Sequence, residues 1–129
     1  MLTKTLDRIK LPSCRLEPVW LIHIELGPED DERIRLSLCD EIGLSYGDYD
    51  HVAFETATGT QFYRGSEGTA SGAMDVATTR PVRVLSFSIA RDEALLTGVM
   101  DIIDRLHSYE EPVVYVRDAY ARRSGASGR

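Results

Sequence analysis

The sequence is poor in cysteine and has no long apolar run. Its two cysteines, Cys14 and Cys39, form neither a metal-binding spacing nor a disulfide framework. No segment approaches the roughly 20 consecutive apolar residues that a membrane-spanning helix needs. The start of the chain alternates charged and apolar residues and contains no continuous signal-peptide core. These absences favour a soluble protein of a reducing cytoplasm that does not contact the membrane.

Positive charge is also scarce. The chain has 15 lysine and arginine residues against 21 acidic residues, and its formal net charge is -6. A field of this sign repels phosphate backbones and argues against nucleic-acid binding. The one basic cluster is "RRSGASGR", residues 122–129, whose Gly and Ser content predicts a flexible end.

Sequence motifs of catalysis are missing. There is no Gly-x-Ser-x-Gly elbow, no His-Glu-x-x-His and no Gly-Lys-Ser/Thr phosphate loop, and neither cysteine has an obvious base. Paired carboxylates occur only in predicted helix starts and turns. Catalysis therefore has little support, and an enzyme whose active site combines two chains is kept as an alternative.

The chain does have the composition of one globular domain. It has 129 residues, of which 43% are hydrophobic and 28% charged. Period-two alternation predicts strands, and apolar residues three and four apart predict helices. The predicted elements are a strand at 19–26, a helix at 29–43, strands at 50–58 and 81–90, a helix at 93–108 and a strand at 112–120.

Local signals support the two helices. Acidic residues 29–32 fill the first turn of the first helix, where the helix dipole favours negative charge, and Gly43 is a natural stop. Asp92 is expected to cap the second helix. Gly98, inside that helix, indicates a close approach to the sheet. Cys39 lies on the apolar face of the first helix, where a buried thiol is common.

The order of elements predicts an α+β fold, the ferredoxin-like βαββαβ sandwich: an antiparallel four-stranded sheet with two helices on one face. Leu21 and several β-branched residues predict an apolar uncovered face, which favours self-association. Residues 1–18 are predicted to be an N-terminal appendage with two helical turns, residues 19–120 the folded domain and residues 121–129 a flexible basic tail. The glycine-rich stretch 59–80 is predicted to be a long loop.

Four segments resemble a known family. They are "EIGLSYGDYDHVAF" (41–54), "TGTQFYRG" (58–65), Gly72 and "HSYEEPVVYV" (107–116). Together they resemble the small domain inserted in Nif-three-like (NGG-one-interacting-factor-three-like) proteins, over about residues 19–118. Ser108 stands where that family usually has proline. The large domain of the family, which carries a two-metal site, has no counterpart here, so the resemblance implies no hydrolase.

The inserted domain is similar in fold to the CutA and PII signalling proteins. Those relatives are trimers whose sheets pack inward and whose second and third strands are joined by a variable loop. The resemblance therefore implies a homo-oligomer, a trimer, with a ligand site in the cleft between subunits.

The candidate ligand-binding residues are His107, Tyr109, Glu110, Tyr49, His51, Thr60 and Arg64. The alternative for the 107–111 motif is a hydrogen-bonded turn that fixes the angle between helix and strand. A divalent metal ion is a candidate cofactor, with His107 and Glu110 as ligands and His51 as an alternative partner of His107. His23 and Glu25 are expected to pair with a charge such as Arg83 or Arg117 across the sheet.

The leading functional hypothesis is a non-catalytic, oligomeric protein of CutA/PII-like type that binds or senses a small molecule or a metal ion. One alternative is a protein–protein interaction module that acts through the 59–80 loop. The other is the enzyme with an active site between subunits.

Overall fold

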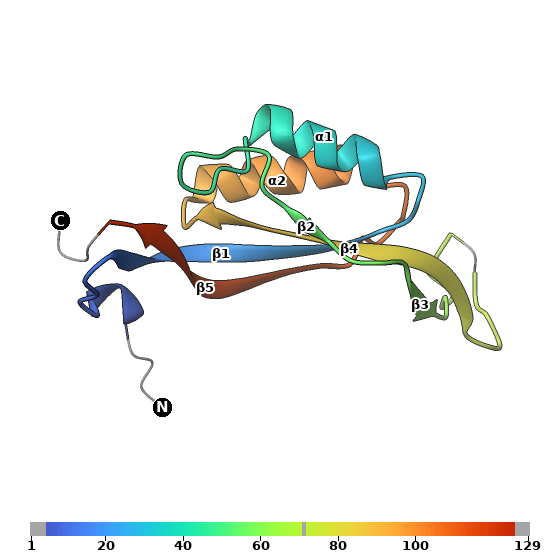
Figure 1. The fold of residues 1–129 in the computed structure, drawn as a ribbon. Helices are drawn as coiled ribbons and strands as arrows, with labels where there is room; N and C mark the ends of the chain where they lie inside the picture. Colours follow the sequence, from blue (N-terminus) through green and yellow to red (C-terminus); the bar gives the residue numbers. More distant parts are fainter. Residues whose placement is uncertain (1–4, 71, 126–129) are drawn as a thin grey trace.

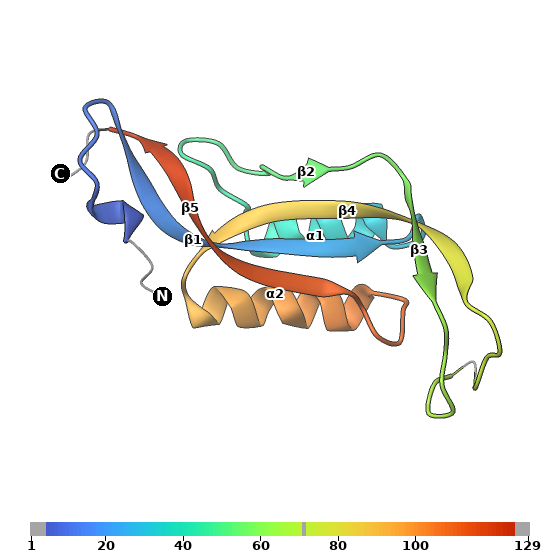
Figure 2. The same cartoon turned by 90° about the horizontal axis from the view of Figure 1, so that it is seen from below.

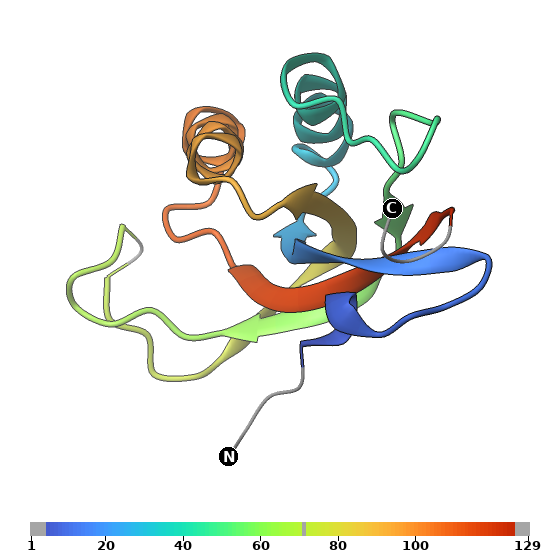
Figure 3. The same cartoon turned by 90° about the vertical axis from the view of Figure 1, so that its left-hand side faces the viewer.

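The computed structural model describes residues 5–70 and 72–125. Its elements are η1 (Leu6–Arg8), β1 (Cys14–Leu26), α1 (Asp31–Glu41), β2 (Phe54–Glu55), β3 (Gly59–Tyr63), β4 (Thr78–Ala90), α2 (Glu93–Leu106) and β5 (Val114–Ser124). The main sheet is antiparallel with the order β2-β4-β1-β5, and β3 pairs with β4. Both helices cover one face of this sheet (Figures 1 and 3). The predicted ferredoxin-like sandwich is confirmed.

The hydrophobic core lies between the helices and the sheet. Alternate residues of β1 point into it, and Ile22, Ile24 and Leu26 are at most 1% exposed. The helices contribute the buried residues Ile34, Leu38, Cys39, Val99, Ile102 and Ile103. Each fully buried aliphatic side chain contributes about 1.5–3 kcal/mol relative to an exposed one. The apolar periodicity therefore predicts correctly which faces form the core.

The helix ends follow the predicted signals, with one correction. Asp92 accepts hydrogen bonds from the backbone N–H groups of Ala94 (2.8 Å) and Leu95 (3.4 Å). Gly43 has φ +97°, the left-handed conformation of a helix stop. A Cβ atom at Gly98 would lie 3.1 Å from Ile42 Cδ1, so this glycine lets α2 approach the end of α1 rather than the sheet. Within residues 5–70 and 72–125, no helix is long and apolar enough to cross a membrane.

The sheet extends beyond both ends of the segment 19–120. The pairing of β1 with β5 extends from Ile24↔Val114 to Cys14↔Ser124, so residues 14–18 and 121–124 belong to the sheet. Pro18 is tolerated inside β1 because β4 pairs only from Val19 onward, which leaves one neighbouring strand at the proline. Of the predicted N-terminal helix the described part holds one 3₁₀ turn, and residues 1–4 and 126–129 lie outside the described residues.

The two ends of the predicted 59–80 loop form a β-hairpin, whereas residues 64–70 and 72–77 contain no strand. Strand β3 pairs with the first part of β4, from Gly59↔Val82 to Tyr63↔Thr78. Residues 59–70 and 72–82, here called the arm, project beyond the helices (Figures 1 and 2). Glycine content suggested a loop, but threonine and aromatic residues favour strands once a partner strand is present. The predicted strand 50–58 is reduced to the two residues of β2, and His51, with φ +59°, lies outside the strand conformation.

The sheet face opposite the helices is less apolar than expected. It carries Leu21 and Val84, but also His23, Ser86 and Arg117, as the strand register shows. His23 Nδ1 lies 3.4 Å from Ser86 Oγ, and its ring meets the edge of Tyr115. Among the described residues, His23 therefore contacts a serine and a tyrosine, and Glu25 accepts a hydrogen bond from Gln61, in place of the expected pairing with Arg83 or Arg117.

Candidate functional site

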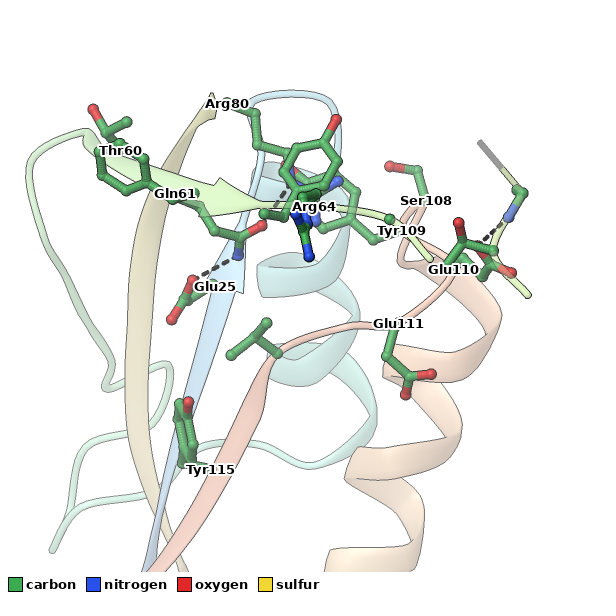
Figure 4. A pocket seen from close by; sticks show the side chains of 16 residues that line it. Glu25, Thr60, Gln61, Arg64, Arg80, Ser108, Tyr109, Glu110, Glu111 and Tyr115 are labelled. Atoms are coloured by element: carbon green, nitrogen blue, oxygen red, sulfur yellow. Dashed lines mark hydrogen bonds between the residues drawn. The ribbon is translucent and has the colours of Figure 1, made fainter. Parts of the chain in front are cut away.

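A cavity of about 770 Å³ lies where the arm meets the turn after α2 (Figure 4). This volume falls in the range of about 300–1,000 Å³ that is typical of small-molecule sites. Its polar and aromatic lining residues include Glu25, Thr60, Gln61, Tyr63, Arg64, Arg80, Ser108, Tyr109, Glu110, Glu111 and Tyr115. The arm and the "HSYEEP" turn, which are far apart in the sequence, therefore form opposite walls of one cavity.

The guanidinium of Arg80 is held between two aromatic rings. Its central carbon lies 3.4 Å from the ring centroid of Tyr109 and 4.4 Å from that of Tyr63. Cation–π contacts of this kind stabilise by about 0.5–2 kcal/mol, depending on desolvation. Burial raises the pKa of Tyr109, which keeps its hydroxyl neutral. The two rings fix one orientation of the guanidinium.

A chain of hydrogen bonds also positions Arg80. Arg80 Nε donates to Gln61 Oε1 at 2.6 Å, and Gln61 Nε2 donates to Glu25 Oε1 at 2.6 Å (Figure 4). Gln61 and Arg80 are direct partners in the β3–β4 register, so they lie on the same face of the hairpin. No described residue accepts a hydrogen bond from Nη1 or Nη2 of Arg80. These donors can bind an anionic group.

The turn after α2 closes the other side of the cavity. Glu110 accepts a hydrogen bond from Ala70 N at 2.9 Å and so connects the turn to the arm. A Cβ atom at Gly27 would lie 2.5 Å from the Tyr109 hydroxyl, so glycine there leaves room for the ring that contacts Arg80. The predicted residues Tyr109, Glu110, Thr60 and Arg64 therefore line the same cavity.

His107 lies behind this wall and is fully buried. Its Nε2 is 2.9 Å from the carbonyl oxygen of Glu25, so Nε2 carries the proton and donates. Its Nδ1 accepts a hydrogen bond from Tyr109 N at 3.2 Å. These contacts connect the end of α2 to β1, which is the structural role considered for the motif.

Asp30 completes this buried junction. Its Oδ2 accepts hydrogen bonds from Ser108 N at 2.9 Å and Ser108 Oγ at 2.7 Å, and its Oδ1 accepts one from Arg33 at 2.7 Å. A proline at position 108 has no N–H and could not make the first bond. Ser108, where the resembling family usually has proline, therefore connects α2 to the start of α1.

Hydrogen bonds keep Asp30 ionised although it is buried. Burial alone would raise the pKa of this carboxyl, but the bonds from Ser108 and Arg33 and the nearby His107 ring outweigh it and lower the pKa. The neighbouring Asp31 behaves differently. Burial and a hydrogen bond shared with Glu55 raise the pKa of Asp31 to about 6, and Arg83, 2.8 Å from Glu55, opposes this shift.

Two predicted site residues lie elsewhere. Tyr49 is 77% exposed in the turn between α1 and β2, and it lines a different cavity with Arg15 and Arg123. That cavity is at the Cys14–Ser124 end of the sheet, whereas Glu25 and Tyr115 mark the end near Arg80. His51 is exposed, and its Nδ1 lies 3.2 Å from Oδ1 of the neighbouring Asp50. The fold of one chain thus separates Tyr49 and His51 from His107.

The metal-ligand set predicted around His107 is not assembled in this chain. Residues 5–70 and 72–125 contain no group of three or more His, Cys, Asp or Glu side chains placed to hold a metal ion. Both ring nitrogens of His107 already have partners, and Glu110 bonds the arm. The residues present do not fit a metal centre in the single chain.

Comparisons with known proteins agree on the fold. No family model and no curated protein sequence matches the chain. A solved Bacillus cereus protein related to NIF3 matches 83% of this chain with a TM-score of 0.68 and 20% identity, and the match covers 27% of that protein. The chain therefore spans about a quarter of that relative's length.

Two CutA structures match over most of both chains. CutA1 from Oryza sativa matches with a TM-score of 0.58 and 15% identity over 81% of this chain and 82% of the other. The divalent ion tolerance protein CutA1 from Ehrlichia chaffeensis matches with a TM-score of 0.58 and 16% identity, over 78% of this chain and 80% of the other. The chain has the ferredoxin-like fold shared by these CutA proteins and by the matching region of the NIF3-related protein, as the motifs indicated.

Proposed function

We propose that this protein is a non-catalytic binding protein for a small anionic molecule, which it holds in the cavity between the arm and the 107–111 turn. The observation that carries the proposal is Arg80, whose guanidinium is fixed by two aromatic rings and Gln61 while two of its nitrogens have no acceptor among the described residues. A pre-oriented guanidinium binds carboxylate or phosphate through two parallel hydrogen bonds.

The other lining residues define what else the ligand presents. Arg64 adds a second positive charge, while Glu25, Glu110 and Glu111 add negative charges around the same cavity. Such mixed lining suits a ligand that carries hydrogen-bond donors as well as an anionic group. The exposed rings of Phe62 and Tyr115 offer apolar contact beside these groups.

The binding experiment is calorimetric titration with ATP and with glutamate as anionic probes, and with zinc chloride as a metal probe. We expect one anionic probe to bind, and Arg80→Gln to weaken this binding at least about tenfold because a charge-assisted hydrogen bond is lost. Arg117→Gln, which makes the same charge change on β5 outside the cavity lining, serves as the matched control.

Three results separate the hypotheses. Equal binding to wild type and Arg80→Gln, or no heat with either anion, would contradict the anion site. Heat with zinc alone, lost in Glu110→Gln, would support the metal-ion version, which the name of the Ehrlichia CutA1 protein also suggests. Turnover of a bound probe would favour the enzyme alternative.

Self-association belongs to the same proposal. The uncovered sheet face carries Leu21, Val84 and the 58%-exposed Tyr115, and the cavity opens beside it. We therefore expect a trimer in analytical ultracentrifugation, and expect Tyr115→Glu to shift the equilibrium toward monomer by burying an unpaired charge. A wild-type protein that sediments as monomer at micromolar concentration would remove the oligomeric part of the proposal.

A further inference from the structure

At the Cys14–Ser124 end of the sheet, three arginines gather around a second cavity. This cavity, of about 550 Å³, is lined by Arg15, Arg122 and Arg123 together with Tyr46, Tyr49 and Asp48. An adjoining cavity of about 360 Å³ also contains Arg15 and Arg123. The chain as a whole carries a formal charge of -6, so this concentration of positive charge contrasts with the rest of the protein.

The strand register places two of these arginines directly opposite each other. Arg15 of β1 pairs with Arg123 of β5, so both side chains leave the sheet on the same face. Like charges at directly opposed positions destabilise an antiparallel pair. Glu17 compensates part of this repulsion through its contact with Arg123 Nε at 2.6 Å, and Arg15 Nη1 donates to the carbonyl oxygen of Ser124 at 2.7 Å.

One donor in this cluster is buried without a partner. Arg123 has a side chain only 13% exposed, and its Nη1 is buried with no hydrogen-bond acceptor among the described residues. An unpaired charged donor of this kind costs about 1–3 kcal/mol or more. A hydrogen-bond acceptor beside this nitrogen, such as an anion or a water molecule, would remove the cost.

Two tyrosines complete the cavity on the side of the α1–β2 connection. Tyr46 and Tyr49 form a backbone bridge, with N···O distances of 2.7 and 3.1 Å, across the turn at Gly47, which has φ +61°. The bridge places both rings on the same side. The ring of Tyr46 lies 4.3 Å from the Arg123 guanidinium carbon, whereas Tyr49 is 77% exposed and available for contact.

We propose that this second cavity binds a small molecule with a phosphate group, whose oxygens contact Arg15 and Arg123, while the neighbouring Arg122 adds positive charge and the unsaturated part of the molecule packs on Tyr49. Three arginines outnumber the two nearby carboxylates, Asp48 and the Glu17 that contacts Arg123, and this excess of positive charge favours an anionic phosphate group. The site is separate from the Arg80 cavity, because the two lie at opposite ends of β1.

Phenyl phosphate is the probe for this site, used in calorimetric titration of the full chain. We expect binding to wild type and at least about tenfold weaker binding to the Arg15→Gln/Arg122→Gln double variant. These two arginines are exposed, so the double variant tests the site even if Arg123→Gln fails to fold. Tyr49→Leu should weaken phenyl phosphate more than inorganic phosphate.

Two controls locate the binding. Arg117 lies on β5 and lines neither cavity, so the Arg117→Gln variant should bind phenyl phosphate as wild type does. If Arg117→Gln weakened binding as much as the double variant does, the probe would be attracted by net charge alone, and the proposal would be overturned. Arg80→Gln should also leave the affinity unchanged, and loss of binding in that variant would place the probe in the other cavity. An absence of binding to wild type at millimolar phenyl phosphate would overturn the proposal directly.

Discussion

Replacing Asp30 with alanine is expected to lower the free energy of unfolding by roughly 3 kcal/mol, because hydrogen bonds to a buried carboxylate are lost and a backbone N–H loses its acceptor. Asp30 is 0% exposed and accepts hydrogen bonds from Ser108 and Arg33. The variant leaves the Ser108 N–H without its acceptor at the junction of both helices. Urea denaturation of wild type and Asp30→Ala measures this loss.

The matched control is Asp40→Ala. Asp40 lies within α1, the helix that Asp30 precedes, but is exposed, so this variant should differ from wild type by no more than about 0.5 kcal/mol. If Asp30→Ala fails to fold, Asp30→Asn keeps the shape of the side chain while it removes the charge. A loss at Asp30 as small as the loss at Asp40 would show that the junction does not depend on this carboxylate.

The effect of Asp30 should also depend on pH. Its pKa in the folded protein is lowered from 3.8, so the ionised form is favoured by folding. The stability that ionised Asp30 contributes to the fold is fully present above pH 3.8. It is lost as the pH falls through the lower pKa that Asp30 has in the folded protein. The pKa of Asp31 is raised to about 6, so Asp31 acts in the opposite direction and costs stability as the pH rises from 3.8 to about 6. Both wild type and Asp30→Ala contain Asp31, so the difference between their free energies of unfolding at each pH isolates the contribution of Asp30.

The sequence predicts the elements of the fold well where apolar periodicity is strong. The stripe of α2 and the alternation of β1 identify the buried residues correctly, and Asp92 marks the start of α2. The arm is missed because β3 has no apolar alternation to reveal it, since Gln61 and Tyr63 pair with Arg80 and Thr78 rather than with the core. Strand pairing with a partner, not local composition, makes this segment a strand.

The candidate site is predicted in part. Residues 108–111 line one cavity with Thr60 and Arg64, because a helix-to-strand turn and an inter-strand connection meet at the same end of this fold, whereas His107 lies buried behind it. Arg80, Gln61 and Tyr63 are missed, since their contacts depend on the hairpin register. Asp30 lies in a run of acidic residues that is predicted only to fill the first turn of a helix, where the helix dipole favours negative charge.

Replacing Leu38 with alanine should lower the free energy of unfolding by about 2–5 kcal/mol, through lost burial and the cavity that remains. Leu38 is 0% exposed and packs in the core between α1 and the sheet. The same helix offers a control with identical chemistry, because Leu36 is 44% exposed.

Leu36→Ala should change stability by no more than about 0.5 kcal/mol. Denaturant unfolding of both variants separates the packing of α1 from its helix propensity, since each exchanges leucine for alanine two residues apart in the same helix. A large loss of stability in Leu38→Ala with little change in Leu36→Ala would show that packing against the sheet holds α1 in place. Asp30, at the start of α1, bonds Ser108, so the same packing supports the turn after α2 that lines the Arg80 cavity. Equal effects of the two substitutions would contradict the packing of α1 described here.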